Sequence, residues 1–103
     1  MFKTERILPG LMFMLKRNKI IISGEVQGVF FRKFVYEHAV KLGLKGYVKN
    51  TEVGDVEAVF EGEEKNVNEM VKLCKKGPRE AKVKNITLIK EKFLDEKEFV
   101  RKN

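Results

Sequence analysis

Apolar residues change their spacing several times along this chain, and the order of these changes constrains the fold most strongly. Residues 20–26 begin with a β-branched run of strand length. Across residues 31–42, apolar side chains recur at i, i+3 and i+4, which predicts a helix that ends at Gly43. Residues 44–50 then alternate as a second strand, so the first half of the chain is predicted to be strand, helix, strand.

The second half of the chain repeats this alternation. Residues 56–61 alternate as the return strand of a β-hairpin, whose tight turn contains Val53-Gly54. Glu63-Glu64 suits the first turn of a second helix, because a carboxylate there meets the positive end of the helix dipole. Gly77-Pro78 is a typical end for that helix.

A last long strand is expected over residues 81–93, and residues 98–101 could add a short fifth strand at an edge. The resulting order, βαββαβ, is the split βαβ pattern of the ferredoxin-like α+β fold. Right-handed crossovers place both helices on one face of an antiparallel sheet, in which the third strand lies between the first and the second. Many unrelated functions use this fold, so the function has to be inferred from a site.

Residues 1–18 differ from the rest of the chain. Three of the four methionines lie there, and an apolar stretch over residues 7–15 resembles the core of a secretory signal. Lys16-Arg17 follows in place of a small-residue cleavage site, so we interpret residues 1–18 as an N-terminal tail or extension, or as the result of a start codon assigned too early. Residues 19–103 are predicted to form one domain. No apolar run reaches the roughly 20 residues of a spanning helix, so we expect no membrane partner and a cytoplasmic location.

The charge balance indicates an anionic partner. The chain has 22 Lys and Arg against 15 Asp and Glu, a net charge of +7, which suits nucleic acid or a small phosphorylated substrate equally. Over the body of the chain the two signs alternate, whereas nucleic-acid binders more often cluster their basic residues. A single cysteine, Cys74, excludes an internal disulfide framework, and with one histidine a structural zinc site would need clustered carboxylates that this sequence lacks.

The stretch Gly24–Arg32, between the first strand and the first helix, is the candidate phosphate site. Backbone N–H groups converge in a glycine-punctuated turn, and a helix N-terminus adds further donors. Arg32 is expected in the first helical turn, where its guanidinium can hold two phosphate oxygens. Its charge opposes the helix dipole there, which is easier to explain if an anion lies between them. Neither a Walker loop nor a G-x-G-x-x-G motif is present, so nucleotide binding of those kinds is not supported.

The sequence Val26-Gln27-Gly28-Val29-Phe30-Phe31-Arg32 resembles the signature of the acylphosphatase family. Residues 43–51, with Asn50 near the end of the second strand, resemble the family's second signature, and the resemblance extends over residues 19–101. The chain departs from the family pattern at Tyr47, where tryptophan is common, and at Glu52-Val53-Gly54, where Asp-Gly is frequent.

This resemblance implies hydrolysis of a carboxylic–phosphoric anhydride to carboxylate and phosphate, with a small-molecule acyl phosphate as the partner. It implies that Arg32 binds the phosphoryl oxygens and that Asn50 orients the attacking water, as the two catalytic residues. The implied phosphate-binding residues are Glu25, Val26, Gln27, Gly28, Val29 and Phe30, in a loop that starts at Gly24. Neither a metal nor an organic cofactor is expected.

A site with so few reactive groups suits this chemistry. The leaving carboxylate is a weak base with a pKa of about 4 to 5, so it needs no general acid. What remains is to position water in line and to stabilise charge on the equatorial oxygens. The carbonyl oxygen of Asn50 can accept a water proton without being a base, and Arg32 with backbone amides can stabilise the charge.

Other polar residues have simpler structural interpretations. His38 lies on the apolar stripe of the first helix and is expected to be packed and hydrogen-bonded, not an acid or base. Cys74 lies on the buried stripe of the second helix and is expected to act as a small hydrophobic residue, not as a nucleophile. Lys75-Lys76 and Arg79 are expected to form the solvated end of that helix.

Two alternatives stay open on the residues alone. RNA-recognition modules share this fold, but the third strand offers Glu57, Val59 and Glu61 on the face opposite Val56, Ala58 and Phe60, and acidic side chains there would repel phosphates. An acylphosphatase-like module that serves a carbamoyl-phosphate-processing assembly is the other alternative, with carbamoyl phosphate as its substrate. We expect a metal-independent, monomeric hydrolase.

Overall fold

The computed structural model describes residues 14–103 of the chain. Its helices and strands follow in the order β1 (Leu15–Glu25), α2 (Phe31–Lys41), β2 (Lys45–Asn50), β3 (Val56–Glu63), α3 (Glu64–Lys76), β4 (Lys82–Glu91) and β5 (Phe99–Arg101). The predicted βαββαβ order is confirmed, and the short fifth strand is present. No helix in this part of the chain is long and apolar enough to cross a membrane.

β1 begins before Lys19, the first residue of the predicted domain. Arg17 and Asn18 are buried, and their backbone pairs with β3 on one side and β4 on the other. This pairing extends β1 through Arg17 and Asn18, whose polar side chains do not predict a buried strand. The rest of the predicted tail, residues 1–13, lies outside the described residues.

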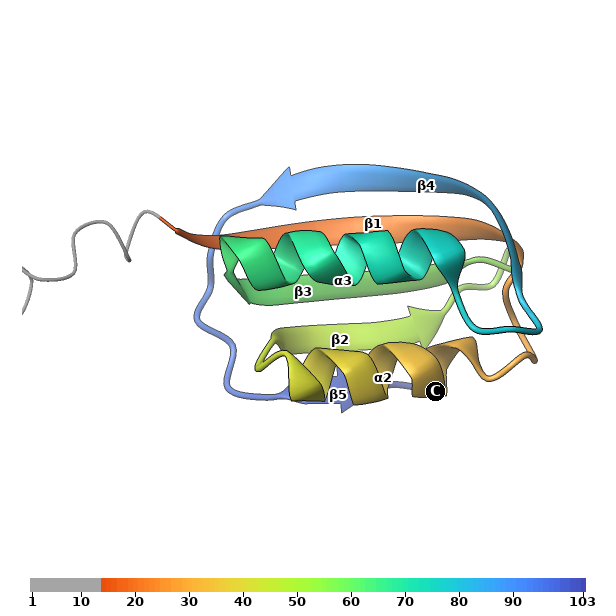
Figure 1. The fold of residues 1–103 in the computed structure, drawn as a ribbon, viewed down its shortest axis with the longest axis horizontal. Coiled ribbons are helices and arrows are strands. Elements are labelled where there is room, and N and C mark those ends of the chain that lie inside the picture. Colours follow the sequence, from red (N-terminus) through yellow and green to blue (C-terminus); the bar gives the residue numbers. More distant parts are fainter. Residues whose placement is uncertain (1–13) are drawn as a thin grey trace, which may run out of the picture.

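The five strands form one sheet in the order β4-β1-β3-β2-β5, with β3 between β1 and β2 as predicted. Neighbouring strands are antiparallel except β2 and β5, which run parallel, so the sheet is mixed and not wholly antiparallel. Figure 1 shows both helices on the same face of the sheet, α3 over β1 and β3, and α2 over β2 and β5.

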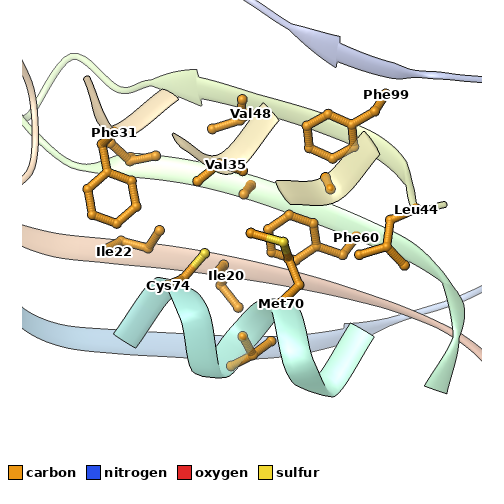
Figure 2. Packing of buried hydrophobic residues seen from close by; sticks show 14 of the residues in the cluster. Ile20, Ile22, Phe31, Val35, Leu44, Val48, Phe60, Met70, Cys74 and Phe99 are labelled. Carbon is orange, nitrogen blue, oxygen red and sulfur yellow. The ribbon is translucent and has the colours of Figure 1, made fainter. Parts of the chain in front are cut away.

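The core lies between this face and the two helices (Figure 2). Alternate residues of β1 and β3 point into it, because side chains alternate between the faces of a strand. The fully buried sheet residues include Ile20, Ile22, Val56, Ala58 and Phe60, and the helices contribute Phe31, Val35, Ala39, Val67, Met70 and Cys74. The helical spacing predicted for both stripes is therefore confirmed.

The opposite face of the sheet carries a buried carboxylate. The register of β3 places Glu57, Val59 and Glu61 on this face, as predicted, but Glu61 is only 1% exposed. Its carboxylate accepts hydrogen bonds of 2.5 to 3.1 Å from the backbone N–H groups of Leu94, Asp95 and Glu96. β4 therefore ends at Glu91 and not at the predicted residue 93, because the following segment turns to meet Glu61.

Arg17 completes this buried cluster. Its guanidinium lies 2.9 Å from Glu91, 3.1 Å from Glu96 and 3.5 Å from Glu61. Burial alone would lower the pKa of Arg17, and the carboxylates of Glu91, Glu96 and Glu61 outweigh it, so that the pKa is raised. The cluster joins β1, β3 and β4 to the segment that leads into β5.

Candidate active site

A cavity of about 240 Å³ opens where the end of β1, the start of α2 and the end of β2 come together. It is lined by Val26, Gly28, Phe30, Phe31, Arg32, Lys33, Asn50 and Arg101. The fold thus brings the two predicted catalytic residues, Arg32 and Asn50, to one cavity, together with half of the residues predicted to bind phosphate.

The loop between β1 and α2 is shaped by two left-handed residues. Gly28 has a φ of 74° and Phe30 a φ of 62°, and the N–H of Phe34 donates to the carbonyl of Phe30 at 3.0 Å, which closes the first turn of α2. Among the described residues, no hydrogen bond uses the backbone N–H of Gly28, Val29 or Phe30. Free donors in such a turn, next to a helix N-terminus, form an anion-binding concavity.

Three of the predicted phosphate-binding residues do not line this cavity: Glu25, Gln27 and Val29. Glu25 is the last residue of β1, where it is exposed and pairs with Lys82, and Val29 packs against the core. Gly24 also belongs to β1, at a register shift against β4. A Cβ on Gly24 would lie 2.1 Å from the carbonyl oxygen of Lys82, so this glycine permits the close approach of the two strands.

The side chain of Gln27 links this loop to the hairpin that follows Asn50. Its Nε2 atom donates to the carbonyl oxygens of Thr51 at 2.9 Å and Asp55 at 2.8 Å. The hairpin turn is closed by a hydrogen bond of 2.9 Å from the N–H of Thr51 to the carbonyl of Asp55. These contacts hold the end of β2, and with it Asn50, against the loop between β1 and α2.

Arg32 is the second residue of α2, in the first turn as predicted. Its Nη1 atom donates a hydrogen bond of 2.6 Å to the carbonyl oxygen of Lys102. The N–H of Lys102 in turn donates to the carbonyl of Val48 in β2 at 2.8 Å. The guanidinium is therefore held between its own helix and the segment that follows β5.

Two residues that line this cavity, Lys33 and Arg101, are not predicted as site residues from the sequence. Arg101 lies two residues after the buried Phe99, so alternation along β5 puts both on the same face of the sheet. The sequence does show this alternation, but it places Arg101 at the cavity only once β5 is known to pair with β2.

The lining of the cavity is positively charged. Arg32, Lys33 and Arg101 contribute three cationic side chains, and no acidic residue lines the cavity. The Nζ atom of Lys33 lies 3.1 Å from the carboxylate of Glu37, one turn along α2, in an exposed pair that does little to reduce the attraction for an anion. A small dianion such as a phosphoryl group fits this field.

His38 and Cys74 lie outside the cavity, as the sequence predicts. The Nδ1 atom of His38 lies 2.9 Å from the carbonyl oxygen of Phe34, and the two rings are 4.4 Å apart. Cys74 is completely buried, and burial raises the pKa of its thiol, which removes the thiolate needed by a nucleophile. Within residues 14–103, no group of three or more His, Cys, Asp or Glu side chains could hold a metal ion.

Known proteins match this chain in sequence and in fold. The family model described as Acylphosphatase matches residues 18–100. A protein named Acylphosphatase from Rubrobacter xylanophilus is 47% identical over 76 residues, which are 74% of this chain and 69% of that protein. The structure of an acylphosphatase from Coxiella burnetii matches with a TM-score of 0.85 at 33% identity, over 91% of this chain and 99% of that one. Acylphosphatase from Bacillus subtilis matches with a TM-score of 0.82 at 37% identity, over 87% and 100% of the two chains.

Proposed function

This chain belongs to the acylphosphatase family, and we propose that the cavity around Arg32 and Asn50 is its active site. The protein is a hydrolase that acts on small-molecule acyl phosphates. The observation that carries the assignment of the site is the convergence of a cationic helix start, a loop with free N–H donors and a strand-end asparagine on one cavity.

In the proposed complex, the phosphoryl group occupies the concavity of the β1–α2 loop. The N–H groups of Gly28, Val29 and Phe30 donate to its oxygens, and Arg32 adds a charged donor. Because these donors are already in place before the reaction, they stabilise the charge on the equatorial oxygens in the transition state without reorganisation.

The side-chain carbonyl of Asn50 accepts a hydrogen bond from a water molecule and directs its oxygen at phosphorus. The water oxygen forms a bond to phosphorus while the bond between phosphorus and the bridging oxygen breaks. The carboxylate leaves with that electron pair, and the water proton passes to the product phosphate or to solvent. The carboxylate is a weak base, so we propose that no general acid and no metal is needed for its departure.

We further propose that the enzyme works as a monomer in the cytoplasm, where the single buried thiol of Cys74 stays reduced. The alternative of a nucleic-acid-binding module is not favoured, since the matching family model is Acylphosphatase and the structures from Coxiella burnetii and Bacillus subtilis are of acylphosphatases.

The experiment that tests the proposed chemistry compares an anhydride with a phosphomonoester. Phosphate release from benzoyl phosphate and from para-nitrophenyl phosphate is measured in EDTA. The expected result is rapid cleavage of benzoyl phosphate only, because the phenolate that leaves from the monoester is a stronger base than a carboxylate and requires more assistance than this site offers. Equal cleavage of both substrates, or activity lost in EDTA, would contradict the mechanism.

A further inference from the structure

Phe30 occupies a position that suits neither its backbone nor its side chain in the free protein. Its backbone is left-handed, with φ 62° and ψ 23°, a conformation that bulky residues rarely adopt and glycine adopts readily. Its side chain is 72% exposed, although a phenylalanine ring is apolar. A glycine at this position would remove both disadvantages, so the ring itself calls for an explanation outside the packing of the core.

None of the other residues that line the cavity offers a large, exposed apolar side chain. Val26 and Phe31 are each 1% exposed and belong to the core. Arg32, Lys33, Asn50 and Arg101 are polar or charged, and Gly28 has no side chain. Among the lining residues, Phe30 alone presents a large apolar surface that a ligand can reach.

An acyl phosphate with a hydrocarbon acyl group has an apolar part that suits such a surface. Its acyl group is joined to the phosphoryl group through a single bridging oxygen, so once the phosphoryl group is held by the loop, the acyl group must lie at the rim of the cavity. In-line attack also requires the acyl group to face away from the water held by Asn50. This reasoning rests on the function proposed above.

We infer that Phe30 determines which acyl groups the enzyme prefers. Its ring packs against the acyl substituent and favours aromatic acyl phosphates over those with a small substituent, such as acetyl or carbamoyl phosphate. Contact between two aromatic rings contributes beyond the area buried, and the gain is specific to substrates that carry a ring.

The test compares kcat/KM for benzoyl phosphate and acetyl phosphate in wild type, Phe30→Asn and Phe30→Tyr. Asparagine accepts the left-handed backbone without a ring, and tyrosine keeps the ring. We expect the benzoyl-to-acetyl ratio to fall about tenfold in Phe30→Asn, as the loss of one aromatic contact predicts, and to stay within about twofold of wild type in Phe30→Tyr. Phe93→Asn, which removes a ring 38% exposed beyond β4, should leave the ratio unchanged.

The possible outcomes are distinguishable. An unchanged ratio in Phe30→Asn would overturn the inference, and so would an equal loss of both activities, since that result assigns Phe30 a role in the loop backbone only. A wild-type protein that folds and cleaves neither substrate would overturn the proposed function itself, and this inference with it.

Discussion

The Nη1 atom of Arg32 donates a hydrogen bond of 2.6 Å to the backbone carbonyl oxygen of Lys102, the residue directly after β5, which pairs with β2. The carbonyl is held there because the N–H of the same residue donates to Val48 at 2.8 Å. The orientation of a guanidinium at the start of the first helix thus depends on the last strand of the chain.

Lys102→Pro tests this dependence. Proline has no N–H to donate to Val48, so the carbonyl that receives Arg32 should shift. A hydrogen bond from a charged donor is worth about 1.5 to 3 kcal/mol, and we expect kcat/KM for benzoyl phosphate to fall about tenfold. Lys102→Ala keeps the backbone contacts and removes only the ammonium above the Tyr47 ring, so its effect should be much smaller. Equal losses in the two variants would assign the effect to the side chain.

Gln27→Ala should reduce kcat more than it raises KM. The substitution removes the donor that ties the β1–α2 loop to Thr51 and Asp55, so Asn50 should shift. We expect this shift to disturb the positioning of the attacking water, which lowers kcat, more than the binding of the phosphoryl group, which would raise KM. We expect kcat to fall about tenfold and the free energy of unfolding by about 1 kcal/mol per lost hydrogen bond. Gln27→Glu has the same shape but places a carboxylate oxygen against two carbonyls, and it should be worse than alanine. Activity restored by Gln27→Glu would show that the donor is not what matters.

Glu61→Gln should be strongly destabilising. The carboxylate is buried, and both of its oxygens accept backbone hydrogen bonds. The amide of glutamine has only one oxygen, so its NH₂ group would face a buried N–H donor that loses its acceptor. Urea unfolding should show a decrease of about 3 kcal/mol in the free energy of unfolding. Lys97→Ala breaks an exposed ion pair with Asp95 in the same segment and should cost well under about 1 kcal/mol. Similar costs for the two substitutions would mean that the buried cluster contributes little.

Stability should decline at alkaline pH partly through Cys74. Burial raises the pKa of its thiol in the folded state. Above about pH 8.5 the unfolded chain releases this proton and the folded chain retains it, so the contribution is present below that pH and is lost as the pH rises, by about 1.4 kcal/mol per pH unit. Urea unfolding at about pH 8 and about pH 10 should therefore show a smaller decline for Cys74→Ala than for wild type. Parallel declines would contradict this assignment.

The helices and the hairpin could be predicted from the residues because their signals are local. The spacing of Phe31, Val35 and Ala39 and the pair Gly77-Pro78 each depend on a few neighbouring positions. The buried role of Glu61 could not be predicted, since its partners lie more than 30 positions away and are backbone N–H groups. Because nearly every residue has a backbone N–H group, residue types do not show which of these groups will bind Glu61.

The same distinction applies to the candidate site. Asn50 and the loop residues stand out by their motifs, and the structure gathers Arg32 and Asn50 at one cavity. Gly24 is predicted to start the phosphate-binding loop because a glycine suits a turn, whereas the structure places it in β1, close to the backbone of Lys82. Arg101 lines the cavity because β5 pairs in parallel with β2, and no local sequence pattern specifies this pairing.

The most direct test of the account separates phosphate binding from turnover in Arg32→Ala and Asn50→Ala. Binding of inorganic phosphate is measured by calorimetry, and turnover with benzoyl phosphate. Asn50→Ala should bind phosphate as wild type does and lose about 10²–10³ in kcat, while Arg32→Ala should lose both phosphate binding and turnover. Wild-type turnover in Asn50→Ala, or wild-type phosphate affinity in Arg32→Ala, would contradict the roles assigned to these two residues.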